Sequence, residues 1–284
     1  MKNLNVLFDM SLDRPTLGGA IILRKESEML AKVMNIFQIN LIINKHKYSK
    51  KNFDNYFKEV FLGSKYKFNI TYNLKNSNIN WPIINKKKSS KFSYTSFYGI
   101  NKLVKKFKFR PILEWNNKIL KTAKKTRKKF PKILIAVHLK NIFPYKEQES
   151  NADGEIWNRF FNFYLSNKKI GFLLLGDDKI PNNIDLNRNI FLAKKMKIPL
   201  SVQLCLVSMC NGFLGMASGP SVAANFSNIP YYIFKHPIHD KKEILKEIGN
   251  TNKLQFAKKS QIILRKIPSA SFLKKITSTY YERI

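Results

Sequence analysis

A turn of small and hydroxyl-bearing residues, Ala217-Ser218-Gly219-Pro220-Ser221, separates a short apolar run from a segment of helix-forming residues. Gly219 allows close backbone approach, and Pro220 suits the first turn of a helix. The amides at a helix start, with the hydroxyls of Ser218 and Ser221, are typical of an anion site. We interpret this turn as phosphate-binding; the alternative is a plain helix cap.

A histidine and a lysine end a second apolar run, which extends from Ile133 to His138 and continues as Leu139-Lys140-Asn141. In an extended chain the side chains of His138 and Lys140 point the same way. A lysine can pair with a phosphate, and an imidazole can donate to a sugar or phosphate oxygen. We therefore expect Lys140 to bind phosphate and His138 to take part in catalysis, the alternative being a histidine that only caps the strand end.

Carboxylates follow two further apolar runs. Asp177 and Asp178 come after Ile170 to Leu175, where they could bind ribose hydroxyls or cap a turn, and we assign Asp177 to the binding site. Asp13 lies in the loop after the first apolar run, where a carboxylate could accept a proton from a hydroxyl. Asp13 is therefore the predicted catalytic base, or else only a turn residue.

The elements that position these residues form two successive α/β series, divided at Phe130-Pro131. In the first series we expect strands at Asn3 to Met10, Phe37 to Ile43 and Phe68 to Tyr72, and helices at Ala20 to Met34 and Ile112 to Lys129. In the second we expect strands at Ile133 to His138, Ile170 to Leu175, Asn189 to Leu192, Gly212 to Met216, Pro230 to Phe234 and Ile262 to Leu264, with helices at Gly154 to Leu165, Pro199 to Met209, Gly219 to Phe226 and Ser269 to Arg283.

This pattern predicts an α/β protein with two Rossmann-like domains, residues 1–130 and 131–284, that face each other across a cleft. Ligands of such sheets bind beyond the carboxyl ends of the strands, which is where the candidate residues stand. Cys205 and Cys210 are spaced so that a bridge within one helix is not expected, and no cluster of the metal-binding type is present in the sequence.

The chain of 284 residues carries a formal net charge of +34. Part of this charge reflects a composition rich in Lys, Asn, Ile and Phe, all encoded by A/T-rich codons; such a surface still attracts nucleic acid, anionic lipid or phosphorylated substrates. No signal-type segment and no apolar stretch long enough to span a membrane is found, so we expect a cytoplasmic protein able to associate peripherally with the inner face of the membrane.

The run from Asn189 to Pro237 resembles the C-terminal domain of GT-B-type glycosyltransferases, in which a strand, a helix, a second strand and a small-residue turn precede a helix under the donor. The heptosyltransferase group has a similar turn that begins with Asp and is followed by His-Leu-Ala-Ala. Here Ala217 replaces that Asp, and Ser221-Val222 precede Ala223-Ala224 without a histidine. Val137-His138-Leu139-Lys140 is similar to the His-x-basic segment of fucosyltransferases with the same fold, which have Arg at the position of Lys140.

The resemblance implies transfer of a sugar from a nucleoside diphosphate donor to a glycan or lipid-linked acceptor, as in surface polysaccharide synthesis. It implies no cofactor and no metal, because helix amides and basic side chains stabilise the leaving diphosphate in such enzymes. Ser218, Gly219, Pro220, Ser221, Lys140 and Asp177 would bind the donor, and the N-terminal domain would bind the acceptor. Two alternatives stay open: a basic nucleic-acid-binding protein, and a non-catalytic binding subunit that keeps the GT-B fold.

Overall fold

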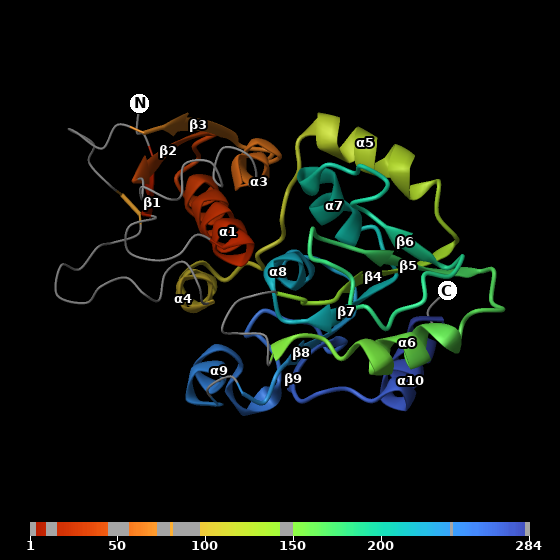
Figure 1. Ribbon diagram of the computed structural model, residues 1–284. Coiled ribbons are helices and arrows are strands. Elements are labelled where there is room, and N and C mark those ends of the chain that lie inside the picture. The colour runs from red at the N-terminus through yellow and green to blue at the C-terminus, as the bar shows by residue number, and fades with distance from the viewer. Residues whose placement is uncertain are drawn as a thin grey trace. The chain divides into compact units, whose positions relative to one another are not determined.

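The computed structural model describes residues 4–9, 16–44, 57–72, 80–81, 97–142, 150–238 and 241–281. Asp13, the predicted base, lies outside these ranges. The chain divides into two compact units, Met1–Ile119 and Leu120–Ile284, and each is described by itself (Figure 1). The division falls within a helix that precedes the predicted boundary at Phe130-Pro131. None of the helices in the described part has the length and apolar character needed to cross a membrane.

The first unit contains a parallel sheet of order β1-β2-β3 in its described part. Its elements are β1 (Leu4–Asp9), α1 (Leu17–Val33), β2 (Gln38–Asn44), α3 (Lys58–Leu62), β3 (Lys67–Thr71) and α4 (Tyr98–Phe107), and α5 (Asn117–Arg127) crosses into the second unit. Helix α1 begins where the Thr16 hydroxyl accepts a hydrogen bond from the Gly19 amide at 3.0 Å. The expected strand–helix–strand opening is thus confirmed.

Helix α1 buries charged side chains as well as apolar ones. Arg24, Lys25, Glu26 and Glu28 are all less than 5% exposed. Glu28 accepts hydrogen bonds from Arg24 Nε at 2.7 Å and from Lys25 Nζ at 3.0 Å. The two cations also donate to the backbone carbonyls of Ile112 and Glu114, and Arg24 lies over the ring of Trp115, at 4.2 Å from its centroid. These interactions satisfy charges that would otherwise be costly to bury.

The predicted helix from Ile112 to Lys129 is wrong in its first part. Residues 112–116 are not helical, and α5 begins only at Asn117. The reason is the group of buried charges on α1. The carbonyls of Ile112 and Glu114 accept hydrogen bonds from Lys25 and Arg24, and Trp115 forms a β-bridge with Ser64. A helix there would use those carbonyls internally and take two acceptors away from the buried cations.

The second unit is built on a six-stranded parallel sheet in the described part of the chain, with order β6-β5-β4-β7-β8-β9. The strands are β4 (Ile133–His138), β5 (Ile170–Leu174), β6 (Ile190–Leu192), β7 (Gly212–Met216), β8 (Tyr231–Lys235) and β9 (Gln261–Arg265). Their near-continuous apolar character follows from burial on both faces. Numbered within the unit, the order is 3-2-1-4-5-6, the order of a Rossmann sheet. The strand predictions are therefore confirmed, with small shifts at the ends.

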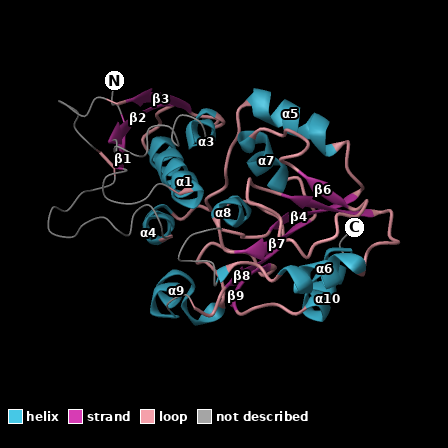
Figure 2. Cartoon of the chain, viewed as in Figure 1, coloured by secondary structure: helices cyan, strands magenta, loops and turns pink. Residues whose placement is uncertain are grey.

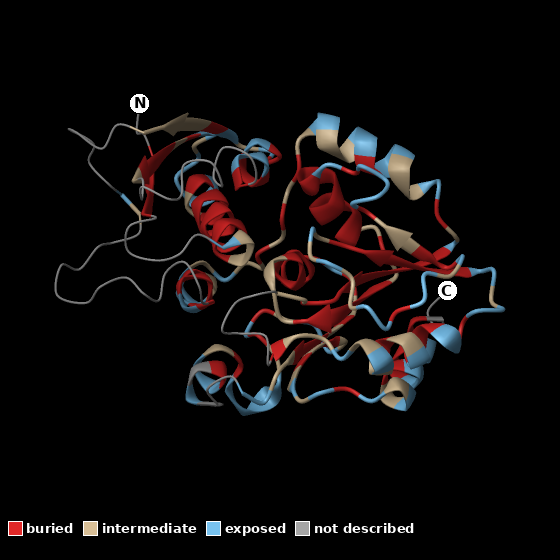
Figure 3. Cartoon of the chain, in the orientation of Figure 1, coloured by how far each residue is buried: buried red, intermediate tan, exposed pale blue. Residues whose placement is uncertain are grey.

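Helices of the second unit cover both faces of this sheet (Figure 2). They are α6 (Gly154–Asn162), α7 (Leu200–Val207), α8 (Gly219–Asn225), α9 (Lys241–Ile248) and α10 (Ala270–Tyr281). Helices α6 and α10 pack against each other, and α7 packs against α8. The core between the sheet and α6 includes Phe172, Phe160 and Trp157, with the rings of Phe160 and Phe172 5.3 Å apart. Figure 3 shows β4, β5, β7 and α7 as the most continuously buried elements.

Candidate functional site

The strand order places a topological switch point between β4 and β7. From β4 the chain proceeds to β5 and β6 on one side, then returns to β7 and continues to β8 and β9 on the other. A crevice opens at the carboxyl ends of such a strand pair because the two connections leave in opposite directions. The residues at these ends are His138 on β4 and, just after β7, the turn that begins at Ala217. Two separately predicted groups of residues therefore meet at one edge of the sheet.

His138 is buried, with 3% of its surface exposed. Its Nδ1 lies 3.0 Å from the Leu175 carbonyl oxygen, so Nδ1 must carry the proton and donate. Its Nε2 lies 3.6 Å from Asp178 Oδ2. Burial lowers the pKa of His138 below its ordinary value, against the raising effects of Asp178 and the Leu175 carbonyl. The imidazole thus ties the end of β4 to the turn that follows β5.

Two glycines make room around this histidine. Gly176 has φ +91°, and a Cβ there would lie 3.1 Å from His138 Cε1 and 3.8 Å from Pro220 Cγ. Gly215 lies near the carboxyl end of β7, and a Cβ there would approach the His138 carbonyl oxygen to 2.4 Å. The Gly176 amide also donates to Gln203 Oε1 on α7 at 3.0 Å. Gly176 therefore lets the turn after β5 pack closely against His138 and the start of α8.

Lys140 is buried too, with 6% of its surface exposed. Its ammonium donates to Ser150 Oγ at 2.5 Å, and its carbonyl accepts from the Ala152 amide at 2.8 Å. Lys140 also contributes to lowering the pKa of His138, which places its positive charge near the imidazole. The segment after β4 is thus fastened to the start of α6, with the Lys140 charge beside the switch point.

The turn after β7 has the expected cap and helix. Ser218 precedes α8, and Gly219 and Pro220 form its first turn. The hydroxyl of Ser221, 3% exposed, accepts from the Ser218 amide at 3.1 Å and donates to the Ser218 carbonyl at 2.7 Å. Ser218 Oγ lies 3.4 Å from the Met216 carbonyl, a long and weak contact. Ser221 therefore stabilises the turn, and the Ser218 hydroxyl is the more available of the two.

A cavity of about 180 Å³ adjoins this group at the carboxyl ends of β4, β5 and β6. Its floor is apolar and its rim is charged; the lining residues are Leu139, Leu174, Leu175, Gly176, Asp178, Lys179, Ile180, Leu192, Lys194 and Lys195. Lys194 Nζ donates to the backbone carbonyl of Asp177 at 2.9 Å. The carboxylate that faces His138 and the cavity is that of Asp178, whereas Asp177 is exposed.

Sequence reasoning missed three residues of this arrangement. Gln203 binds the Gly176 amide, Gly176 packs on His138, and Lys194 reaches the Asp177 carbonyl. Gly176 carried a signal in the sequence, because it directly follows an apolar run and precedes two aspartates. Gln203 lies on a helix whose eight residues, Leu200–Val207, are all buried, and a buried glutamine in such a helix is the kind of signal that could have found it.

Comparison with known proteins gives matches in structure alone. No protein-family model and no curated protein matches the sequence. A glycosyl transferase family 9 protein from Veillonella parvula DSM 2008 has a similar fold, with 12% identity and a TM-score of 0.54 over 100% of this chain and 98% of that chain. The dodecameric iron-containing heptosyltransferase TibC, in complex with ADP-D-beta-D-heptose, gives 9% identity and a TM-score of 0.52 over 100% of this chain and 78% of that chain.

The E. coli heptosyltransferase WaaC with ADP gives 9% identity and a TM-score of 0.50 over 99% of both chains. At such identities the likeness establishes the fold. The chain therefore has the α/β fold of the GT-B class, as the resemblance in the sequence implied. How the two units face each other stays a prediction.

Proposed function

We propose that the protein is a glycosyltransferase that moves a sugar from a nucleoside diphosphate donor to a glycan or lipid-linked acceptor. The observation that carries the proposal is the switch point of the second unit, where Lys140, the Ser218 turn and the basic cavity rim lie at one sheet edge. Support comes from the fold, which is shared with a heptosyltransferase described in complex with ADP-D-beta-D-heptose.

The cavity has the chemistry of a nucleotide site. A base is apolar on its faces and fits a floor of leucine and isoleucine, while phosphates are attracted to Lys179, Lys194 and Lys195. Asp178 offers a carboxylate to ribose hydroxyls. In this proposal the Lys140 charge and the amides at the start of α8 stabilise the leaving diphosphate without a resident metal. His138 acts by positioning the turn after β5, and Asp13 is the proposed base.

The wider setting is part of the same proposal. A role in surface polysaccharide synthesis, a cytoplasmic location and peripheral binding at an anionic membrane are consistent with the charge of +34. The exposed lysines of α5, among them Lys118, Lys121, Lys124 and Lys125, would contribute to such attraction. A nucleotide panel with ADP, GDP, UDP, CMP and dTDP tests the donor site directly, because a ligand that binds only the folded state raises the melting temperature.

The sharpest version of the test compares two lysine pairs. Lys194→Gln with Lys195→Gln removes charge at the cavity rim, and Lys168→Gln with Lys169→Gln removes the same charge at the amino end of β5, on the opposite edge of the sheet. We expect the first pair to weaken nucleotide binding about tenfold, roughly 1.4 kcal/mol, and the second to leave it unchanged. No response to any nucleotide would overturn the proposal, and binding without sugar transfer would favour a non-catalytic relative.

A further inference from the structure

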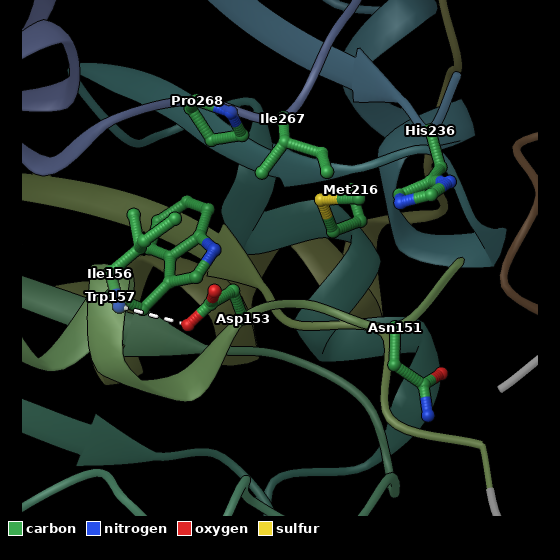
Figure 4. A pocket seen from close by; sticks show the side chains of 8 residues that line it. All are labelled: Asn151, Asp153, Ile156, Trp157, Met216, His236, Ile267 and Pro268. Atoms are coloured by element: carbon green, nitrogen blue, oxygen red, sulfur yellow. Dashed lines mark hydrogen bonds between the residues drawn. The ribbon is translucent and has the colours of Figure 1, made fainter. Parts of the chain in front are cut away.

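A second cavity, of about 200 Å³, lies in the same unit on the other side of the switch point. It is lined by residues from the carboxyl ends of β7, β8 and β9 and from the start of α6, and Figure 4 shows all of them: Asn151, Asp153, Ile156, Trp157, Met216, His236, Ile267 and Pro268. None of these residues lines the basic cavity described above. Its lining is about equally polar and apolar, and its described lining residues include no lysine or arginine.

The indole of Trp157 supplies a hydrogen-bond donor to this cavity. Trp157 is 1% exposed and packs edge-on against Phe160, with the ring centroids 5.8 Å apart. Figure 4 shows its Nε1 turned toward the interior of the pocket. An indole N–H that faces a cavity can donate a hydrogen bond to a ligand bound there.

Two further polar groups stand at the same cavity. Asp153 caps α6 through Oδ1, which accepts from the amides of Glu155 at 3.0 Å and Ile156 at 3.1 Å, and this leaves Oδ2 to accept from a ligand. His236 Nδ1 accepts from the Ile238 amide at 3.2 Å, so the neutral ring carries its proton on Nε2 and can donate. The cavity thus combines two donors, a carboxylate acceptor and several apolar side chains.

We infer that this cavity binds a neutral sugar ring. A pyranose has C–H faces that pack on apolar side chains such as Met216 and Ile267, and hydroxyls that both donate and accept hydrogen bonds. Hydroxyl groups can accept from Trp157 and His236 while donating to Asp153. A phosphate is disfavoured, because the described lining residues offer a carboxylate and neither lysine nor arginine.

The position of the cavity gives this sugar a role that rests on the proposed function. Met216 ends β7 and is followed directly by the Ala217-Ser218 turn. A sugar against Met216 therefore lies beside the proposed donor phosphates without occupying their site. We assign the cavity to a neutral sugar of the acceptor, so that part of the acceptor binds the second unit in addition to the N-terminal domain expected from the sequence.

Saturation-transfer NMR with neutral monosaccharides and short oligosaccharides, in the absence of nucleotide, tests the inference. Asp153→Asn keeps the helix cap, because Asn caps as well as Asp, but removes the charged acceptor. Trp157→Phe keeps a ring in the core but removes the N–H. We expect each substitution to weaken sugar binding at least fivefold, while nucleotide binding to the same samples is unchanged.

The lysine pair Lys194→Gln with Lys195→Gln should show the opposite behaviour, with weaker nucleotide binding and unchanged sugar binding. If Trp157→Phe lowers the melting temperature strongly, Asp153→Asn alone decides the outcome. Absence of sugar binding, or sugar binding that neither cavity substitution weakens, would overturn the inference. Nucleotide binding in those samples would still support the donor site. The two proposals are therefore tested by separate measurements.

Discussion

Gly176 lies directly against the imidazole of His138: a Cβ on Gly176 would approach Cε1 to 3.1 Å and Nδ1 to 3.2 Å. Gly176 also has φ +91°, a conformation that side chains other than hydrogen disfavour. We expect Gly176→Ala to lower the free energy of unfolding by about 2 kcal/mol and to weaken nucleotide binding, because the turn shifts away from His138. Urea denaturation and calorimetry measure the two effects.

Gly249 provides the control for that substitution. It has φ +57°, but a Cβ there would meet no atom within 4 Å. Gly249→Ala therefore carries the backbone penalty without the contact with a histidine. If both variants lose the same stability and both bind nucleotide normally, the packing of Gly176 on His138 does not contribute to nucleotide binding.

Gln203 is expected to hold the turn after β5, which belongs to the proposed nucleotide site. It is 4% exposed, accepts from the Gly176 amide at 3.0 Å and donates to the Ile198 carbonyl at 2.8 Å. Gln203→Leu leaves both backbone groups without a partner, at a cost of about 2–4 kcal/mol. Gln203→Glu keeps the acceptor for Gly176 and loses only the donor, so it should retain more nucleotide affinity than the leucine variant. Equal affinity in the two variants would contradict this role.

Because Glu26 is buried, we expect the free energy of unfolding to fall as the pH rises. Burial raises its pKa from 4.5 to about 8, against the lowering effect of the hydrogen bond from Trp81. Between these values the folded state holds a proton that the unfolded state releases, so the favourable contribution is complete below pH 4.5 and is lost as the pH rises through 8. Glu26→Gln should therefore be more stable than the parent at pH 8, by on the order of 3 kcal/mol, and nearly equal at pH 5.

The exposed Glu59 serves as the comparison for Glu26, since Glu59→Gln removes the same charge from the same unit at the surface. Chemical denaturation across pH 5–8 measures both. A stability difference between the Glu26 variant and the parent that does not depend on pH would show that Glu26 is ionised in the folded state.

Glu28, one half-turn further along α1, predicts the opposite dependence. Burial acts to raise its pKa, but Arg24, Lys25 and Ser64 together bring it below the ordinary value. Its contribution is therefore present above about pH 4.5 and is lost as the pH falls through the folded-state pKa. Glu28→Gln leaves two buried cations without a charge partner and should cost about 3–5 kcal/mol at pH 7. This cost should shrink on acidification, and a cost that grows would refute the assignment.

The strands of the second unit were predictable because each is a short apolar run bounded by turn residues. The runs Ile133 to His138 and Gly212 to Met216 need no tertiary information to be recognised as buried strands. The helix at Ile112 could not be corrected from the sequence. The carbonyls of Glu114 and Ile112 accept hydrogen bonds from Arg24 and Lys25, which lie 90 and 87 residues away along the chain.

The site was predictable in part for the same reason. His138, Lys140 and the Ser218 turn each follow a recognisable strand, so their place at the carboxyl edge follows from the pattern of elements. Gln203 and Lys194 contact the turn after β5 through folds of the chain that no local pattern encodes. Ser221 was predicted as a ligand-binding residue, but its hydrogen bonds to Ser218 follow from the capping geometry of α8.

The connection between β5 and β6 contains no helix, although parallel neighbours in such sheets are commonly joined by one. Its residues, from Leu175 to Asn189, form a wall of the basic cavity through Asp178, Lys179 and Ile180, while the aromatic core beneath is filled from α6. Ligand preference and core stability are thereby encoded in different stretches of chain. If the proposed donor site is correct, insertions or exchanges in this connection alter which nucleotide is accepted and leave the Trp157–Phe160–Phe172 packing untouched.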